Sequence, residues 1–343
     1  MKKIGLVFLF SCAAVIAADW LNVGGDAKHS GFQSRARFFR QGEASGFVVL
    51  WKKQLPNAPL GSNGLTAPIV IGPIVTHRGI KEMIFVAGSS NKVFSVDADL
   101  GRVLWTRDFR VAAQPDGKSP CGEGMTASMA MEPENTAKLP NDEDDPDFHA
   151  KMRPLYALTS DGILHTIWPS TGLDSTKPLP FLPAGAHAGP LTYADGKVST
   201  TTTNACNGTL DALWSIDVKT AAVTRTASKP IETTATANGW TYEATAYGVT
   251  ATQNNVIAWK TESMLKPLQP AIVKGVVFVL DAGSPTVHAK LYAFDAATGK
   301  QLYQSGDSIE SYIQSSALAV ANGHVTFATA DNTLYCFGFP LEI

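Results

Sequence analysis

The stretch that decides the fold is Ser95-Val96-Asp97-Ala98-Asp99-Leu100-Gly101-Arg102-Val103-Leu104-Trp105. Apolar residues lead into Asp97, whose carboxylate can accept hydrogen bonds from the backbone of a following turn. Gly101 can adopt the positive φ that such a turn requires. Trp105 then falls on the returning segment. The stretch predicts a strand, a tight turn and a second strand that carries an aromatic side chain.

A second copy of this pattern lies far along the chain, in Ala293-Phe294-Asp295-Ala296-Ala297-Thr298-Gly299-Lys300-Gln301-Leu302-Tyr303. Asp295, Gly299 and Tyr303 stand where Asp97, Gly101 and Trp105 stand in the first copy. A further apolar segment precedes each copy, at 84–87 and at 276–280. Self-similarity of this kind indicates a repeat protein.

Weaker copies fill the rest of the chain. The residues just before the turns of the successive copies are Ser95, Thr166, Ser215, Ala258, Ala293 and Cys336. Repeats of about 40–50 residues with four strands each are typical of β-propeller blades. The sequence therefore predicts an all-β propeller of six four-stranded blades. Seven blades is the alternative, because the fourth copy looks truncated and residues 229–240 are assigned to no strand.

The two ends of the chain predict how the ring closes. The last copy stops at Cys336-Phe337-Gly338, where its outer strand should begin. Residues 47–51 form an unassigned strand near the N-terminus, and its Trp51 would take the position of Trp105. We expect this N-terminal strand to complete the final blade, which removes the open sheet edges that favour aggregation.

These motifs resemble a known family. Asp-x-x-x-Gly-x-x-x-Trp, with Ser or Ala two residues before the Asp, is similar to the tryptophan-docking motif of the pyrroloquinoline quinone (PQQ) repeat, or quinoprotein dehydrogenase-like, propellers. The segment from Trp20 to Asp26 is similar to the opening of many of these proteins. The resemblance implies that Trp105 and Trp51, together with Tyr303, pack between blades. Only two of the copies are near-complete, which favours a non-catalytic or divergent member.

The first residues have the pattern of a signal peptide. Lys2 and Lys3 precede an uncharged, largely apolar run at 4–16, and small residues follow at Ala17 and Ala18. We expect residues 1–18 to be removed and 19–343 to form a single propeller domain. The leader has a bacterial style, so the protein would be exported to the periplasm or outside the cell. A lipid anchor at Cys12 is the alternative, and no later segment is apolar enough to span a membrane.

Charge excludes one class of partner. The net charge is −2 and no basic patch stands out, so nucleic acid is not an expected partner. An acidic stretch from Asp142 to Asp147 lies in an insertion at about 132–150. It lacks the glycine and the final glutamate of a calcium-binding loop, so we expect a solvated surface loop and predict no metal site.

The cysteines after the leader are Cys121, Cys206 and Cys336. In a propeller, loops between blades and loops between second and third strands emerge on one face. Cys121 and Cys206 fall in such loops, so a disulfide between them is one hypothesis and two separate thiols the other. Cys336 lies in an apolar strand and is expected to be buried.

The same face would carry Glu123, Asn204 and Glu243, together with His187, Trp240 and Gln314. In catalytic quinoproteins this face holds the quinone and a calcium ion, so the resemblance makes Glu123, Asn204 and Glu243 candidate cofactor-binding residues only if PQQ and calcium bind. No cofactor is predicted and catalytic residues are unknown. We expect an exported binding or scaffold module for a protein, peptide or glycan ligand on the loop face. The alternative is a PQQ-dependent dehydrogenase of an alcohol or sugar.

Overall fold

The computed structural model describes residues 18–36, 39, 41–58, 64–76, 79–111, 121, 124–133, 153–227 and 234–340. This part of the chain is built from strands, with short 3-10 helices at Gln41–Gly46 and Cys206–Gly208. Within it, no helix has the length and apolar character needed to cross a membrane. The expected leader with Cys12, and the acidic stretch from Asp142 to Asp147, lie outside the described residues.

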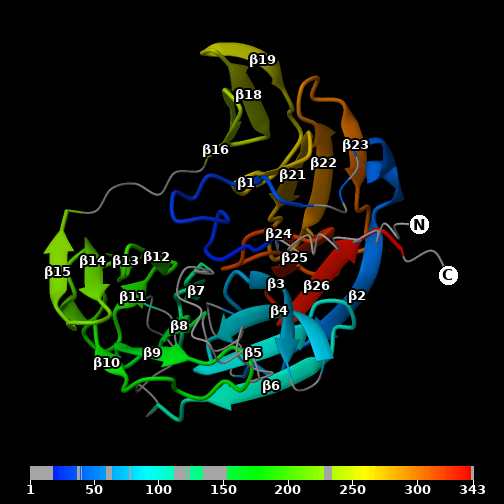
Figure 1. The fold of residues 1–343 in the computed structure, drawn as a ribbon. Helices are drawn as coiled ribbons and strands as arrows, with labels where there is room; N and C mark the ends of the chain where they lie inside the picture. The colour runs from blue at the N-terminus through cyan, green and yellow to red at the C-terminus, as the bar shows by residue number, and fades with distance from the viewer. Residues whose placement is uncertain are drawn as a thin grey trace, which may run out of the picture.

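The strands form six sheets arranged around a central region, so the protein is a six-bladed β-propeller (Figure 1). We number the blades in chain order. Blade 1 contains β3 (Ile69–Thr76), β4 (Gly79–Gly88), β5 (Lys92–Asp97) and β6 (Val103–Asp108). Blade 2 contains β7 (Ala130–Met131), β8 (Leu155–Leu158), β9 (Ile163–Ile167) and β10 (Leu179–Pro180).

The remaining blades follow the same plan. Blade 3 contains β11 (His187–Ala188), β12 (Thr192–Ala194), β13 (Lys197–Thr203), β14 (Ala212–Asp217) and β15 (Val223–Thr226). Blade 4 contains β16 (Thr234–Ala237), β17 (Trp240–Ala244), β18 (Val249–Gln253) and β19 (Val256–Lys260). Blade 5 contains β20 (Ala271–Val273), β21 (Val276–Asp281), β22 (Lys290–Asp295) and β23 (Gln301–Gln304), and the short β1 (Phe32–Gln33) pairs in parallel with β20. Blade 6 contains β24 (Ala319–Ala321), β25 (His324–Ala328) and β26 (Thr333–Gly338).

The N-terminal strand completes blade 6, as the sequence predicts. Strand β2 (Val48–Gln54) pairs antiparallel with β26, and Trp51 lies opposite Cys336 in the register. The chain thereby supplies the outer strand of the last blade from its beginning. An early and a late segment of the chain are thus held in one sheet, which limits fraying of either strand.

Tryptophans of one blade dock on the turn of the next. The indole of Trp51 lies over Gly101, and its Nε1 donates a hydrogen bond to the Ala98 carbonyl at 2.7 Å. Trp105 lies over Gly172 and donates to Pro169 at 2.8 Å; Trp259 lies over Gly299 and donates to Ala296 at 2.9 Å. The contact therefore joins blade 6 to 1, 1 to 2, and 4 to 5.

Tyr303 makes a different contact. Its ring packs against Phe47 with the centroids 5.8 Å apart. Blade 6 has no turn between its third and fourth strands, because β26 and β2 come from opposite ends of the chain. At blade 6, Phe47 therefore provides the surface on which Tyr303 packs, where blades 1, 2 and 5 provide a turn with a glycine.

The turns themselves form as the sequence indicates. The Asp97 carboxylate accepts hydrogen bonds from the backbone N–H groups of Asp99 and Leu100, at 3.1 and 3.2 Å. Asp295 does the same for the two residues that follow Ala296. Gly101 and Gly299 have φ values of 63° and 70°, in the left-handed region that glycine adopts without steric cost.

The structure corrects the expected fourth blade. Strand β16 and the start of β17 lie within residues 229–240, where no strand was assigned, so blade 4 is complete rather than truncated. The error has a physical source. Thr234–Ala237 alternates threonine and alanine, and without large apolar residues it lacks the signal of a buried strand.

Candidate functional site

The N-terminal segment, residues 18–33, runs through the centre of the ring (Figure 1). Leu21 accepts a hydrogen bond from the Met131 N–H of blade 2, and the Asn22 side chain accepts one from Tyr193 of blade 3. The innermost strands of all six blades bond to this segment, through Val70, Met131, Tyr193, Thr236, Ile272 and Val320. Trp20 is buried at this centre. The axis is therefore filled by the chain itself.

Apolar clusters join neighbouring blades at five of the six junctions in the described part. They link blade 1 to 2, blade 2 to 3, blade 4 to 5, and blades 5, 6 and 1 together. No cluster contains residues of both blade 3 and blade 4 among the described residues. The junction between blades 3 and 4 is thus built differently from the others.

The wall that blade 3 turns toward this junction is polar. One side of blade 3 carries Val198 and Ile216, which pack in a cluster with residues of blade 2. Paired residues on the opposite side are mostly hydroxylic: Thr192, Ser199, Thr201, Ser215, Thr224 and Thr226. These side chains are partly or fully exposed.

Blade 4 faces the same junction with a matching wall. Tyr242, Ala251 and Trp259 lie on the side packed against blade 5. The other side carries two rows of paired residues, which are Thr234, Glu243, Thr250 and Lys260, and Thr236, Thr241, Thr252 and Ile257. We call these two polar walls, taken together, the threonine seam.

A groove of about 590 Å³ opens at one end of the blade 4 wall. It is lined by the loop between β17 and β18, by one residue each of β18 and β19, and by the segment that follows β19, namely Thr245, Tyr247, Thr250, Lys260, Thr261, Glu262, Ser263 and Met264. Thr250 and Lys260 belong to both the groove and the seam. Tyr247 is 69% exposed, so its ring is available to a ligand.

The inner end of the seam is bridged by His29. Its Nδ1 donates to the Val23 carbonyl at 2.5 Å, because a carbonyl can only accept. In the neutral ring Nε2 then accepts the hydroxyl of Thr192 of blade 3, at 2.9 Å. The next residue, Ser30, accepts a hydrogen bond from the Thr236 N–H of blade 4 at 2.8 Å. The two walls are therefore held at the axis by polar contacts.

Two tyrosines lie on the buried sides of the blades that form the seam. Burial raises the pKa of Tyr193 to about 12, with the nearby Glu132 carboxylate adding to the effect. Burial also raises the pKa of Tyr242 to about 12, and its hydroxyl donates to the Ala296 carbonyl at 3.1 Å. Both groups stay neutral at physiological pH and act in packing.

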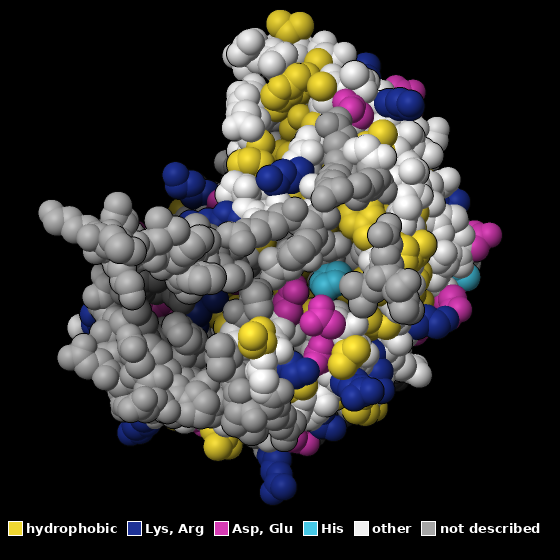
Figure 2. All heavy atoms as spheres, turned by 45° about the vertical axis from the view of Figure 1, so that its right-hand side comes forward, with side chains coloured by type: hydrophobic (Ala, Val, Ile, Leu, Met, Phe, Trp, Pro, Cys, Tyr) yellow, Lys and Arg dark blue, Asp and Glu magenta, His cyan; other side chains and the backbone are white. Residues whose placement is uncertain are grey.

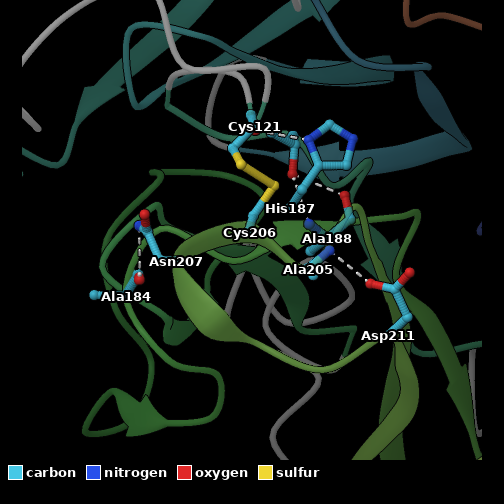
Figure 3. Close-up of a disulfide and its surroundings, with 9 residues drawn as sticks. Cys121, Ala184, His187, Ala188, Ala205, Cys206, Asn207 and Asp211 are labelled. Carbon is cyan, nitrogen blue, oxygen red and sulfur yellow. Dashed lines mark hydrogen bonds between the residues drawn. A yellow bond between two sulfur atoms is a disulfide. The ribbon is translucent and has the colours of Figure 1, made fainter.

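The structure joins Cys121 and Cys206 in a disulfide, with the Cα atoms 5.5 Å apart (Figure 3). His187 lies beside the bond, and its Nδ1 contacts the Cys121 carbonyl at 2.8 Å. Asp211 accepts a hydrogen bond from the Ala205 N–H at 2.8 Å and fixes the loop around Cys206. Cys336 is free and buried.

The two predicted cofactor residues in the described part lie on different blades. Asn204 is exposed on the loop before Cys206, while Glu243 is exposed on the seam wall of blade 4. Glu123 lies outside the described residues. Trp240 was placed on the wrong face: it follows the turn between β16 and β17, at the opposite end of the blade from the β17–β18 loop. That misplacement follows from the missed strand β16.

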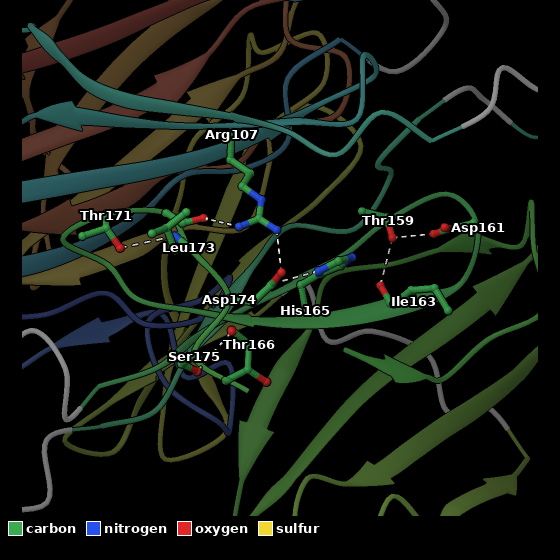
Figure 4. A network of polar contacts seen from close by, with 11 residues as sticks. Arg107, Thr159, Asp161, Ile163, His165, Thr166, Thr171, Leu173, Asp174 and Ser175 are labelled. Carbon is green, nitrogen blue, oxygen red and sulfur yellow. Dashed lines mark hydrogen bonds and ion pairs between the residues drawn. The ribbon is translucent and has the colours of Figure 1, made fainter. Parts of the chain in front are cut away.

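A network of hydrogen bonds and ion pairs joins blade 1 to blade 2 (Figure 4). Arg107 donates to Asp174 at 2.6 Å and to the Gly172 carbonyl at 2.9 Å. His165 contacts the other oxygen of Asp174 at 3.0 Å. Each charged group in the network already has a partner within it. The network therefore stabilises the blade junction beside Trp105 and has few free polar groups for a ligand.

Basic side chains do not gather on the visible surface. Figure 2 shows Lys and Arg interspersed with Asp and Glu over the described part of the face in view. Such an interspersed pattern lacks the continuous positive potential that a phosphate backbone requires.

No known protein family and no curated protein matches the sequence. Among solved structures, the chain is similar to BamB from Moraxella catarrhalis, at 12% identity and a TM-score of 0.33, over 85% of this chain and 100% of that one. A designed protein, Ika8, is 10% identical with a TM-score of 0.47 over 83% and 98% of the two chains. A quinohemoprotein alcohol dehydrogenase from Comamonas testosteroni is 12% identical with a TM-score of 0.39 over 92% of this chain. This chain spans 48% of the dehydrogenase.

The described residues supply only part of the predicted quinone and calcium site, because Glu123 lies outside them. Carboxylate and amide oxygens must converge on the ion, yet Glu243 belongs to no converging group of acidic, His or Cys side chains in the described part. The single such group there is Glu82, Asp99 and His324. The ring centre is also filled by Trp20 and its neighbours. We therefore derive no step through a quinone.

Proposed function

We propose that this protein is an exported binding module whose ligand lies in the threonine seam and its adjoining groove. The observation that carries the proposal is the pair of exposed, hydroxyl-rich walls at the one junction without an apolar cluster in the described part. A propeller junction that serves only stability would be expected to bury apolar surface, as the other five do.

The chemistry of the walls favours a glycan. Each threonine or serine hydroxyl can both donate and accept a hydrogen bond, which matches the hydroxyls of a sugar. The ring of Tyr247 at the groove supplies an apolar face with a polar tip, suited to stacking on a sugar ring. Glu262 and Lys260 add one charge of each sign at the groove. Ile257, 57% exposed, is an apolar member of the blade 4 wall and adds a face for the apolar side of a sugar ring.

Export is the part of the proposal that rests on the sequence. The pattern of Lys2, Lys3 and the apolar run at 4–16 is that of a leader. The disulfide between Cys121 and Cys206 is consistent with an oxidising compartment. The expected place is the periplasm or the cell exterior.

The test is a titration of the purified protein with soluble oligosaccharides, followed by calorimetry. Replacing Thr250 or Thr241 by valine removes one hydroxyl at nearly constant volume. A lost hydrogen bond of about 1 kcal/mol should weaken binding about 5-fold for each variant. Thr286→Val is the matched control, because Thr286 is exposed in a loop of blade 5.

Two results would reject the proposal. One is oligosaccharide binding that Thr250→Val, Thr241→Val and Thr286→Val all leave unchanged, which would place the ligand elsewhere. The other is the absence of binding to every oligosaccharide while a peptide binds with loss in the Thr250→Val variant, which would replace the glycan by a peptide.

A further inference from the structure

A carboxylate–histidine group lies at the junction of blades 6 and 1, at the opposite end of the blades from the disulfide. Glu82 is on β4, Asp99 is in the turn after β5, and His324 begins β25. One ligand atom from each of the three lies within 4.8 Å of the others. Two blades thus bring three potential ligands together from distant parts of the chain.

Two atoms of this group lack hydrogen-bond partners although they are buried. Glu82 is 6% exposed, and neither its Oε1 nor the Nδ1 of His324 has a hydrogen-bond partner. The two atoms face one another at 3.6 Å, too far for a hydrogen bond. A buried carboxylate oxygen without a hydrogen bond is costly, so this arrangement favours a cation bound between the two atoms.

The separation suits a shared metal ion. A tetrahedral cation with ligand bonds of about 2.0–2.2 Å holds neighbouring ligand atoms about 3.4 Å apart. The 3.6 Å between Glu82 Oε1 and His324 Nδ1 is close to this value. Asp99 is exposed and can adjust its side chain to complete the set.

We propose that Glu82, Asp99 and His324 bind one divalent transition-metal ion, with Zn²⁺ the best match. One imidazole nitrogen with two carboxylates suits zinc and its neighbours, whereas calcium prefers oxygen ligands alone. Water would fill the remaining position on the exposed side, beside Asp99.

The ion would link blade 1 to blade 6, the blade that the N-terminal strand completes. Asp99 directly follows Ala98, whose carbonyl receives the Trp51 indole of blade 6. His324 belongs to the same blade as Trp51. A metal bound by Glu82, Asp99 and His324 would therefore join blades 1 and 6 a second time, next to the docking tryptophan.

The experiment uses the full mature chain, stripped with a chelator and dialysed. Zn²⁺ is titrated by calorimetry, with Ca²⁺ as the comparison ion, and thermal unfolding is followed with and without Zn²⁺. We expect one Zn²⁺ per chain, a higher Tm with zinc, and no comparable binding of Ca²⁺. Glu82→Gln and His324→Gln should each weaken zinc binding about 10-fold or more.

Asp99→Asn and two control variants distinguish the loss of a zinc ligand from misfolding of the protein. Asp99 is exposed, so its variant should fold normally and still lose affinity. Asp307→Asn and His288→Gln change exposed groups outside the site and should bind zinc as the wild type does. No stoichiometric zinc binding, or equal affinity in Asp99→Asn and in the controls, would overturn the proposal and leave Glu82 and His324 as an ion pair alone.

Discussion

The indole of Trp51 occupies the space that a side chain at Gly101 would need: a Cβ added there would lie 2.7 Å from Trp51 Cδ2. Gly101 also has a φ of 63°, which strains any residue with a Cβ. We predict that Gly101→Ala destabilises the fold by about 2–4 kcal/mol, through both effects. Denaturant unfolding of the purified protein measures the loss.

Gly196→Ala separates the two causes. Gly196 has a φ of 78°, but a Cβ there meets no atom within 4 Å. It should lose only the backbone contribution, about 1 kcal/mol. Equal losses at Gly196 and Gly101 would show that the tryptophan contact adds nothing to stability.

The disulfide should contribute strongly to stability. Cys121 and Cys206 are 85 residues apart, and a closed loop of this size reduces the entropy of the unfolded chain by the equivalent of about 4–5 kcal/mol. Reduction, or the double replacement of both cysteines by serine, should lower Tm markedly. Cys336→Ala, which leaves the bond intact, serves as the control.

Counting thiols tests the bond itself. The unfolded, unreduced chain without its leader should show one reactive thiol, that of Cys336. Three reactive thiols would mean that Cys121 and Cys206 are not joined in the purified protein.

Blade number, ring closure and the first docking contacts could be predicted from the sequence because they depend on local motifs. Asp97, Gly101 and Trp105 lie within one turn and its two strands. Trp259 was not recognised as a docking residue. Its own blade lacks the Asp-x-x-x-Gly turn, and its partner Gly299 belongs to the next blade. Without that turn, nothing in the sequence around Trp259 marks it as a docking residue.

The candidate site could not be predicted for a related reason. The seam is defined by which side of each strand lacks an apolar neighbour, and that depends on how blades 3 and 4 stand in the ring. Thr250 and Thr252 look like ordinary strand residues in the sequence. The central segment is equally hidden, since Leu21 and Ser30 contact their blades through backbone atoms, which carry no side-chain signal.

Alkaline pH should weaken the fold through its buried tyrosines. Burial raises the pKa of Tyr303 to about 12 in the folded protein, against about 10 in the unfolded chain. The folded state therefore holds this proton more tightly. The associated stability is complete below pH 10 and is lost as the pH rises from 10 to 12.

Tyr303→Phe removes this dependence at one position. Between pH 10 and 12 the variant should lose less stability than the wild type, as measured by urea unfolding at several pH values. Tyr247→Phe is the control, because Tyr247 is 69% exposed. If the free energy of unfolding fell equally with pH in the wild type and in Tyr303→Phe, the pKa of Tyr303 would not be raised in the folded protein.

The quinone alternative predicts a simple response. Because Glu243 belongs to no group of three or more converging acidic, His or Cys side chains in the described part, we expect PQQ with calcium to leave Tm unchanged. A ligand at about 100 times its Kd would add about 2.7 kcal/mol, which thermal unfolding detects readily. A clear rise in Tm, with reduction of a dye by an alcohol or sugar, would favour the dehydrogenase.

The seam should also be the place where the ring opens first. Local stability follows the density of buried apolar contacts, and the junction of blades 3 and 4 has no apolar cluster among the described residues. Backbone amides of β14 and β18 should therefore exchange with solvent at least about 10-fold faster than those of β22 and β26. Native-state hydrogen exchange read by mass spectrometry resolves these strands.

His29→Leu sharpens this prediction. The variant removes the hydrogen bond from the N-terminal segment to Thr192, which helps hold blade 3 to the axis. Exchange should increase in β12 and β13, with β26 unchanged because its partner β2 is unaffected. A uniform increase over all six blades would show instead that the ring opens as one cooperative unit and that the seam is as firm as the apolar junctions.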